Sequence, residues 1–267
     1  MAAAVTQSTL IADLAALGIV AGDSVMVHAG LRSIGPIIGG PDALIAALLE
    51  VVGGDGTVMA YADWQGAPEW ACDEEGHILP QWREHVLPFD PARSRAIRDN
   101  GAFPEFLRTT PAALRSASPG PSMTALGAKA RWLIDPHPLD YGYGPGTPLA
   151  RLVEAGGKVM MIGAPWETMT LLHHAEHLAD IPGKRIVRWD VPFAAPDGVI
   201  WRTVEEFDTG NPVVDGLEDE YFEQVVCDFV AQGGGLQGMI GSAPTLVVNA
   251  EPMVAFAVDW LESRFSS

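Results

Sequence analysis

The stretch SVMVHAGL, residues 24–31, decides the fold. It is a short apolar run rich in valine and methionine, it ends close to a glycine, and it has no helical spacing of polar residues. Two further runs share these features, GTVMAYADW (56–64) and GKVMMIGAP (157–165). Runs of this kind are typical of strands buried on both faces, so we predict three central strands of one sheet.

Helical patterns separate these strands. We predict helices over PDALIAALLEVV (41–52), FPEFLRT (103–109), TPLARLVEAG (147–156), EDEYFEQVVCDFVAQG (218–233) and EPMVAFAVDWLESRF (251–265). The segments RIVRWDVPFA and VIWRTVEEFD flank Pro196, Asp197 and Gly198, which predicts an antiparallel hairpin with a loop slightly longer than the tightest type. The fold class expected is α/β: one domain over residues 1–267, with a mixed central sheet flanked by helices and a late hairpin.

Acidic residues dominate the charge of the chain. It has 16 Lys and Arg against 34 Asp and Glu, a net charge of −18. Such a surface disfavours nucleic-acid and anionic-membrane partners and attracts small polycations, although acidity can also serve solubility alone. The first twenty residues lack a signal-peptide pattern, and no run reaches the ~18 apolar residues of a membrane span, so we expect a cytoplasmic protein. Cys72 and Cys227 lie far apart and are expected to be reduced thiols.

The segment TLLHHAEHLA, residues 170–179, concentrates residues that can do chemistry. His173, Glu176 and His177 match H-x-x-E-H, in which two histidines hold zinc and the glutamate activates water. The same residues also suit a histidine general base oriented by a carboxylate, without a metal. A zinc-dependent hydrolase using residues 173–177 is therefore the alternative function, although no third ligand can be identified in the sequence.

The first predicted strand runs into HAGLRSIG, residues 28–35. A loop of small residues after a strand can hold an anion with its backbone N–H groups, here joined by Arg32 and Ser33. The spacing matches neither G-x-G-x-x-G nor the P-loop. The chain also lacks a complete G-x-S-x-G elbow and the Arg/Gln-x-x-Gly-x-Gly/Ala loop of the GNAT fold, the commonest acetyltransferase fold. A serine hydrolase and a GNAT enzyme are both disfavoured.

Six segments follow one another along the chain: HAGLRSIG, GTVMAYADW, RSASPGPSMTALG, YGYGPGTPLARL, TLLHHAEHLADIPGKR and VEEFDTGNPV. Taken in this order they resemble one family, the aminoglycoside 3-N-acetyltransferases, also called the antibiotic N-acetyltransferase family. The resemblance implies transfer of an acetyl group from acetyl-coenzyme A to the 3-amino group of a 2-deoxystreptamine aminoglycoside, which confers antibiotic resistance. It implies acetyl-coenzyme A as co-substrate, a polycationic small molecule as partner and no metal ion.

The resemblance also implies roles for particular residues. His173 matches the catalytic base, with Glu176 in the same motif, and Asp208 matches an acidic residue that supports the histidine or the substrate. The coenzyme is expected to contact Arg32, Ser33, Ile34, Gly35, Arg115 and Ser116. The aminoglycoside is expected to contact Asp63, Trp64, Glu205, Glu206 and Asp208, with Glu69 in reserve for Asp63.

Elementary chemistry supports a base at this position. An amine attacks a thioester only when neutral, and most aminoglycoside amines are protonated near neutral pH, so the site must accept a proton. A histidine can do this, and a carboxylate on its other ring nitrogen fixes the tautomer. Ring-to-carboxylate geometry within one helix is often poor, so we favour Asp208 over Glu176 as that carboxylate. A non-catalytic, cation-binding module is a further alternative, but it would explain only the charge of the chain and nothing in the segment 170–179.

Overall fold

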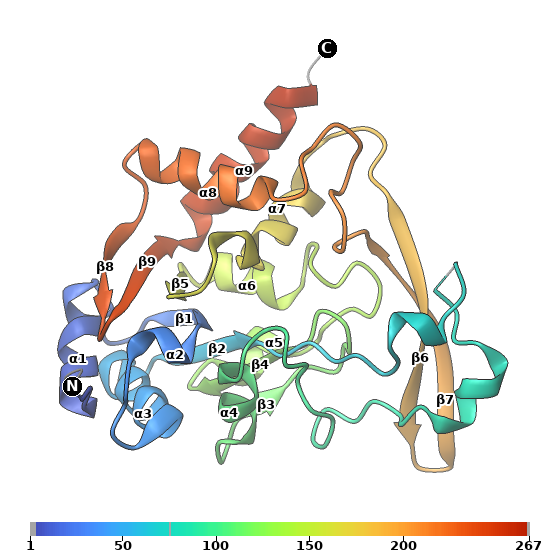
Figure 1. Cartoon of the computed structure of the whole chain (residues 1–267), viewed down its shortest axis with the longest axis horizontal. Helices are drawn as coiled ribbons and strands as arrows, with labels where there is room; N and C mark the ends of the chain where they lie inside the picture. The colour runs from blue at the N-terminus through green and yellow to red at the C-terminus, as the bar shows by residue number, and fades with distance from the viewer. Residues whose placement is uncertain (1–3, 75, 266–267) are drawn as a thin grey trace.

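Seven strands form the central sheet of the computed structural model, which describes residues 4–74 and 76–265 (Figure 1). Their order is β3-β4-β2-β1-β5-β9-β8. The strands are β1 (Ser24–Ala29), β2 (Thr57–Tyr61), β3 (Leu114–Arg115), β4 (Met123–Gly127), β5 (Lys158–Ile162), β8 (Leu236–Ile240) and β9 (Ala243–Asn249). β1 runs parallel to both β2 and β5, and the outer pairings are antiparallel. The three predicted central strands are therefore confirmed, within a mixed sheet.

Side chains alternate across the sheet and divide the core in two. Val25 and Val27 of β1 face a cluster built with α1 (Gln7–Ala16), α2 (Leu31–Ile34), α3 (Gly40–Val52) and α4 (Phe103–Thr109). Met26, between them, faces a second cluster on the opposite side. That side is covered by α5 (Ala130–Ile134), α6 (Pro148–Glu154), α7 (Leu171–Leu178), α8 (Tyr221–Ala231) and α9 (Ala250–Phe265). Figure 1 shows α7, α8 and α9 on one side of the sheet and α1, α2 and α3 on the other.

The late hairpin consists of β6 (Ile186–Ala195) and β7 (Gly198–Phe207), which form a separate two-stranded sheet. Ala195 pairs with Gly198, so the loop contains only Pro196 and Asp197 and is tighter than predicted. Figure 1 shows the hairpin at one end of the molecule, along the segment that leaves β2. Phe89 of that segment packs with Val191 and Val204 of the hairpin in a small core of its own.

Short 3₁₀ helices lie in the connections, at Glu69–Ala71 (η1), Pro80–His85 (η2) and Trp166–Thr168 (η3). All five predicted helices are present, with bounds that differ by up to three residues. Within residues 4–74 and 76–265, none of the helices has the length and apolar character that a bilayer crossing requires. The α/β class, the mixed sheet and the late hairpin are confirmed.

Candidate active site

The three parallel strands point their carboxyl ends at one edge of the sheet, where ligands bind in many open α/β proteins. His28 and Tyr61 lie at the ends of β1 and β2. Strand alternation turns both toward the face of Met26 and Met59, which α7 covers. The histidine-rich helix α7 and the ends of the parallel strands therefore meet on one side of the sheet.

The orienting carboxylate of His173 comes from its own helix. His173 Nδ1 lies 2.6 Å from Glu176 Oε2, one turn further along α7. Glu176 is only 1% exposed, and Tyr221 of α8 donates its hydroxyl to the other carboxylate oxygen. Tyr221 therefore fixes a carboxylate that could otherwise turn away from the ring. The side chain of His173 is 18% exposed, and Nε2 is the nitrogen left for a substrate.

Asp208 does not fill the role that we favoured for it. Its Oδ1 accepts from the backbone N–H groups of Gly210 at 3.0 Å and Asn211 at 3.2 Å, and its Oδ2 accepts from Asn211 Nδ2 at 3.0 Å. Arg185 Nε lies 3.6 Å from Oδ2. Asp208 therefore closes the turn after β7, and the carboxylate on His173 is Glu176.

The geometry of His177 disfavours the zinc alternative. Its Nδ1 donates to the backbone oxygen of His173 at 2.7 Å, and its Nε2 lies 2.6 Å from Glu206 Oε1. Both ring nitrogens are therefore engaged inside the protein. In the described part of the chain, no group of three or more His, Cys, Asp or Glu side chains is arranged to hold a metal ion. The neighbouring His174 is buried and donates to Tyr143 O at 2.7 Å.

Aromatic rings surround His173. The rings of Tyr143 and Phe222 each lie 4.9 Å from its ring, measured between centroids. The hydroxyls of Tyr143 and Tyr61 are 2.6 Å apart, which links the histidine to the end of β2. Burial raises the pKa of both tyrosines well above the ordinary value, so both stay protonated and can only exchange hydrogen bonds with neighbours.

A cavity of about 860 Å³ opens beside the loop that follows β1; we call it the basic cavity. The loops after β1 and β5 approach each other here at Gly30 and Gly163. A Cβ on Gly30 would lie 2.5 Å from the Gly163 oxygen, which is too close, so this approach requires glycine. Arg32 and Ser33, both expected to contact the coenzyme, line this cavity, and Ser33 Oγ donates to Gly30 O at 2.7 Å. Two further lining residues, which have no signal in the sequence, are Arg95 and Arg98; Arg95 forms an ion pair with Glu105, which also lines the cavity.

Four of the six residues expected to bind the coenzyme do not line the basic cavity. Ile34 is fully buried in the core, and Gly35 makes the turn after α2 at a φ of 100°. Arg115 Nε donates to Ser122 Oγ at 2.8 Å, and its Nη atoms donate to the backbone oxygens of Ser94, Ala62 and Asp63. Ser116 Oγ accepts from Met123 N at 2.9 Å. Arg115 and Ser116 are therefore part of the scaffold.

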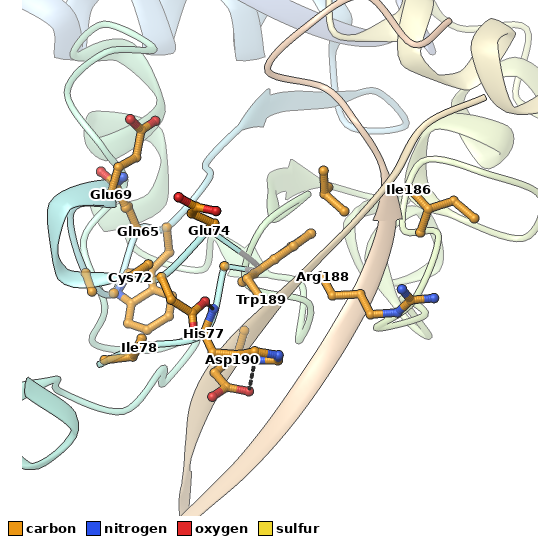
Figure 2. Close-up of a pocket in the computed structure, with 17 residues that line it drawn as sticks. Gln65, Glu69, Cys72, Glu74, His77, Ile78, Ile186, Arg188, Trp189 and Asp190 are labelled. Carbon is orange, nitrogen blue, oxygen red and sulfur yellow. Dashed lines mark hydrogen bonds and ion pairs between the residues drawn. The ribbon is translucent and has the colours of Figure 1, made fainter. Parts of the chain in front are cut away.

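A second cavity, of about 800 Å³, lies between the segment after β2 and strand β6; we call it the acidic cavity (Figure 2). Carboxylates line it from both sides: Glu69, Asp73, Glu74 and Asp190. Figure 2 shows Glu69 and Glu74 on the loop side, and Arg188, Trp189 and Asp190 on β6. Asp190 already binds Arg83 Nη1 at 2.6 Å, which with Thr203 and His77 helps to lower the pKa of its carboxyl despite partial burial.

Of the expected aminoglycoside contacts, only Trp64 lines the acidic cavity. Glu206 is buried against His177, and Glu205 accepts from Tyr141 Oη at 2.5 Å and from Arg188. Asp63 lies directly before Trp64, at the end of β2. The reserve residue Glu69 does line the cavity. Asp73 and Glu74 belong to an acidic run that signals carboxylates for an aminoglycoside in the sequence, whereas Asp190 of β6 has no such signal.

A family model for aminoglycoside 3-N-acetyltransferases matches residues 26–262. The chain belongs to this family. It is 45% identical to aminoglycoside N(3)-acetyltransferase III of Pseudomonas aeruginosa, over 97% of this chain and 94% of that protein. It is 43% identical to aminoglycoside N(3)-acetyltransferase VIII of Streptomyces fradiae, over 97% of this chain and 93% of that one. Both relatives are acyltransferases by name, and the acetyltransferase described here is one too.

Solved structures show the same fold. A structure of AAC-IIIb in a binary complex with CoASH is 60% identical, with a TM-score of 0.97 and 99% coverage of both chains. A structure of AAC-VIa bound to sisomicin is 34% identical, with a TM-score of 0.93 and coverage of 99% of this chain and 100% of that one. The family fold is not that of the GNAT enzymes.

Asp63 gives this acetyltransferase a pH-dependent stability. Burial raises the pKa of its carboxyl from 3.8 to about 7, against smaller lowering effects that include Arg115. Below pH ~4 the carboxyl is protonated in both the folded and the unfolded chain. As pH rises from ~4 toward 7, only the unfolded chain releases the proton, so the folded state loses stability relative to the unfolded one. Asp63→Asn should therefore raise the free energy of unfolding by at least about 1 kcal/mol at pH 8 and by much less at pH 4, measured by urea denaturation. An equal effect at both pH values would show that Asp63 titrates normally.

Proposed function

We propose that this acetyltransferase moves the acetyl group of acetyl-coenzyme A directly to the 3-amino group of 2-deoxystreptamine aminoglycosides, and that residues 1–267 act as one catalytic domain. The observation that carries the proposal is the His173–Glu176 pair with Nε2 left open. Family membership supports the reaction class, and the CoASH and sisomicin complexes of AAC-IIIb and AAC-VIa support the two ligand classes.

The proposed step needs one base and no covalent enzyme intermediate. His173 Nε2 takes the proton from the 3-amino group as its nitrogen attacks the thioester carbon. The tetrahedral intermediate then collapses, the C–S bond breaks, and the thiolate of coenzyme A takes that proton back from His173. Glu176, on Nδ1, holds the ring in the tautomer whose Nε2 can accept the proton and stabilises the imidazolium.

The charges of the two cavities assign the two substrates. The basic cavity carries Arg32, Arg95 and Arg98 against one carboxylate, Glu105, which pairs with Arg95, and this excess of positive charge suits the phosphates of coenzyme A. The acidic cavity carries four carboxylates against one arginine, Arg188; although Asp190 is paired with Arg83, the excess of negative charge suits the ammonium groups of an aminoglycoside. Acetylation turns one ammonium into a neutral amide, so the product is a weaker cation, and loss of that charge would underlie resistance. We propose a cytoplasmic enzyme without nucleic-acid or membrane partners, in keeping with its charge of −18.

A direct assay tests the proposed function. Release of the coenzyme A thiol is followed with acetyl-coenzyme A and a panel of 2-deoxystreptamine aminoglycosides, and the acetylated position is located by mass spectrometry and NMR. We expect acetylation at the 3-amino group. Acetylation only at another amine would contradict the regiochemistry, and no thiol release with any aminoglycoside would contradict the function.

The charge division predicts opposite kinetic effects at the two cavities. Glu74→Gln removes a carboxylate that lines the acidic cavity and should raise the aminoglycoside KM about 3- to 10-fold, without changing the KM for acetyl-coenzyme A. Arg98→Gln should raise the KM for acetyl-coenzyme A by a similar factor and leave the aminoglycoside KM unchanged. Steady-state kinetics in both substrates measures these values. Equal changes in both KM values for either variant would show that the cavities are misassigned.

A further inference from the structure

A third, smaller cavity of about 190 Å³ borders the basic cavity; we call it the inner cavity. It shares Ala29, Gly30 and Gly101 with the basic cavity. On its other side it is lined by Tyr61, whose hydroxyl meets Tyr143, and Tyr143 packs on His173. The inner cavity therefore lies beside the end of the basic cavity, on the side of His173.

Two buried nitrogens that line this cavity have no partner. Among the described residues, Nε2 of His28 and Nδ2 of Asn100 are fully buried and make no hydrogen bond. The lining is otherwise small or apolar, apart from Tyr61, Thr168 and Asp99. A buried polar nitrogen without a partner costs on the order of 1–3 kcal/mol. Two of them on one cavity point to a ligand that carries a hydrogen-bond acceptor.

The fold fixes the position and the charge of His28. It is the fifth residue of the central strand β1, opposite Met161 of β5. Strand alternation directs it to the face that carries His173, away from the valines at positions 25 and 27. Burial lowers the pKa of His28 to about 4, so the ring is neutral near neutral pH. A neutral imidazole can donate one hydrogen bond without bringing a charge.

We infer that the inner cavity holds the acetyl group of the thioester, with Asn100 Nδ2 donating a hydrogen bond to the carbonyl oxygen and His28 beside it on the same oxygen. The inference rests on the proposed acetyl transfer and names two catalytic residues, His28 and Asn100, to which the family resemblance assigned no role. The pantetheine arm would lie in the basic cavity, and the thioester would enter the inner cavity past Gly30 and Gly101.

The chemistry of transfer gives these donors their effect. As the amine nitrogen bonds to the thioester carbon, the carbonyl π electrons move to oxygen, and negative charge develops there in the transition state that leads to the tetrahedral intermediate. A preorganised amide N–H stabilises that charge without reorganising solvent, and removal of one such donor typically lowers kcat by about 100- to 1,000-fold. When the C–S bond breaks, the carbonyl re-forms and the charge leaves with the coenzyme A thiolate.

The test uses the whole protein and three variants. Asn100→Asp keeps the shape of the side chain but replaces its NH₂ group with oxygen, and Asn100→Ala removes it. Asn249→Ala is the matched control. Asn249 is exposed at the end of β9 and pairs with the first residue of β5, so it lies at the end of the sheet opposite the carboxyl ends of the parallel strands. Three quantities are measured: kcat, the calorimetric Kd of CoASH, and the infrared carbonyl band of bound [1-¹³C]acetyl-coenzyme A without an aminoglycoside.

We expect both Asn100 variants to lose about 100-fold or more in kcat, to bind CoASH as the wild type does, and to show the carbonyl band at higher frequency than the wild type. Asn249→Ala should match the wild type in all three. A wild-type carbonyl frequency in both Asn100 variants, with kcat within about 3-fold, would overturn the inference. If the wild type binds acetyl-coenzyme A but acetylates no aminoglycoside, the proposed function is wrong. The carbonyl band of bound acetyl-coenzyme A, compared between the wild type and the Asn100 variants, still tests the inference. Absence of acetyl-coenzyme A binding would overturn both.

Discussion

Replacement of His173 by alanine should lower kcat by about 100- to 10,000-fold, as expected when a general base is removed from a proton-transfer step. The ring offers an open Nε2 to the substrate, and its Nδ1 is held by Glu176. Alanine removes the proton acceptor but leaves both ligand cavities intact, because His173 lines neither of them. The Kd of CoASH, measured by calorimetry, should therefore stay within about 3-fold of the wild type.

The matched control is His85→Ala. His85 is an exposed histidine of η2 that lines none of the three cavities, so its replacement should leave kcat unchanged. Circular dichroism checks that both variants fold. A His173→Ala enzyme that keeps more than about a tenth of wild-type turnover would take the base role away from His173. Loss of wild-type activity on chelation, with recovery on adding zinc, would instead favour the hydrolase alternative.

The sequence was sufficient to predict the centre of the fold. Strands buried on both faces must be apolar almost throughout, so β1, β2 and β5 stand out as continuous runs. The outer strands do not. β8 is as long as β2 and β5 but mostly exposed, and β3 has only two residues, so nothing in their local pattern distinguishes them from loops. Their pairing depends on β9 and β4, which only the folded chain brings alongside.

The site was predictable where it depends on motifs and not where it depends on tertiary contacts. His173 and Glu176 share a helix turn, so their proximity is contained in the sequence. Arg98 and Asn100 reach the site from a loop far from any motif, and nothing in their neighbours signals it. Arg115 is the opposite case: it is expected to contact the coenzyme, and in the structure its guanidinium ties backbone oxygens of two other segments together.

Which carboxylate bonds the His173 ring, Glu176 or Asp208, depends on a residue outside the motif. Within one helix, a carboxylate three residues from a histidine has several rotamers that miss the ring. Tyr221 comes from α8, forty-five residues further along the chain, and its hydroxyl holds the second oxygen of Glu176 in the buried site. Asp208 is meanwhile occupied by the backbone of its own turn. The sequence shows both carboxylates but not their partners.

This arrangement predicts that Glu176→Gln and Asp208→Asn differ sharply in kcat. Glutamine keeps the size of the side chain but carries no charge, and its NH₂ group can donate to Nδ1, which places the ring proton on Nε2 where it blocks the base. The loss expected is about 100-fold or more in kcat, by analogy with the corresponding carboxylate-to-amide change in a serine protease triad. Asp208→Asn should change kcat by less than about 3-fold, because its oxygen still caps the turn.

A spectroscopic measurement separates positioning from mere folding. The ¹⁵N chemical shifts of the His173 ring report which nitrogen carries the proton, and a general loss of structure would not reproduce a specific change of tautomer. We expect a proton on Nδ1 in the wild type and in Asp208→Asn, and a larger fraction on Nε2 in Glu176→Gln. If Asp208→Asn lost the activity and changed the tautomer while Glu176→Gln did neither, the orienting carboxylate would be Asp208, reached by a rearrangement on substrate binding. If both variants kept full activity, His173 would need no carboxylate, and its tautomer would have to be held by the aromatic packing of Tyr143 and Phe222 alone.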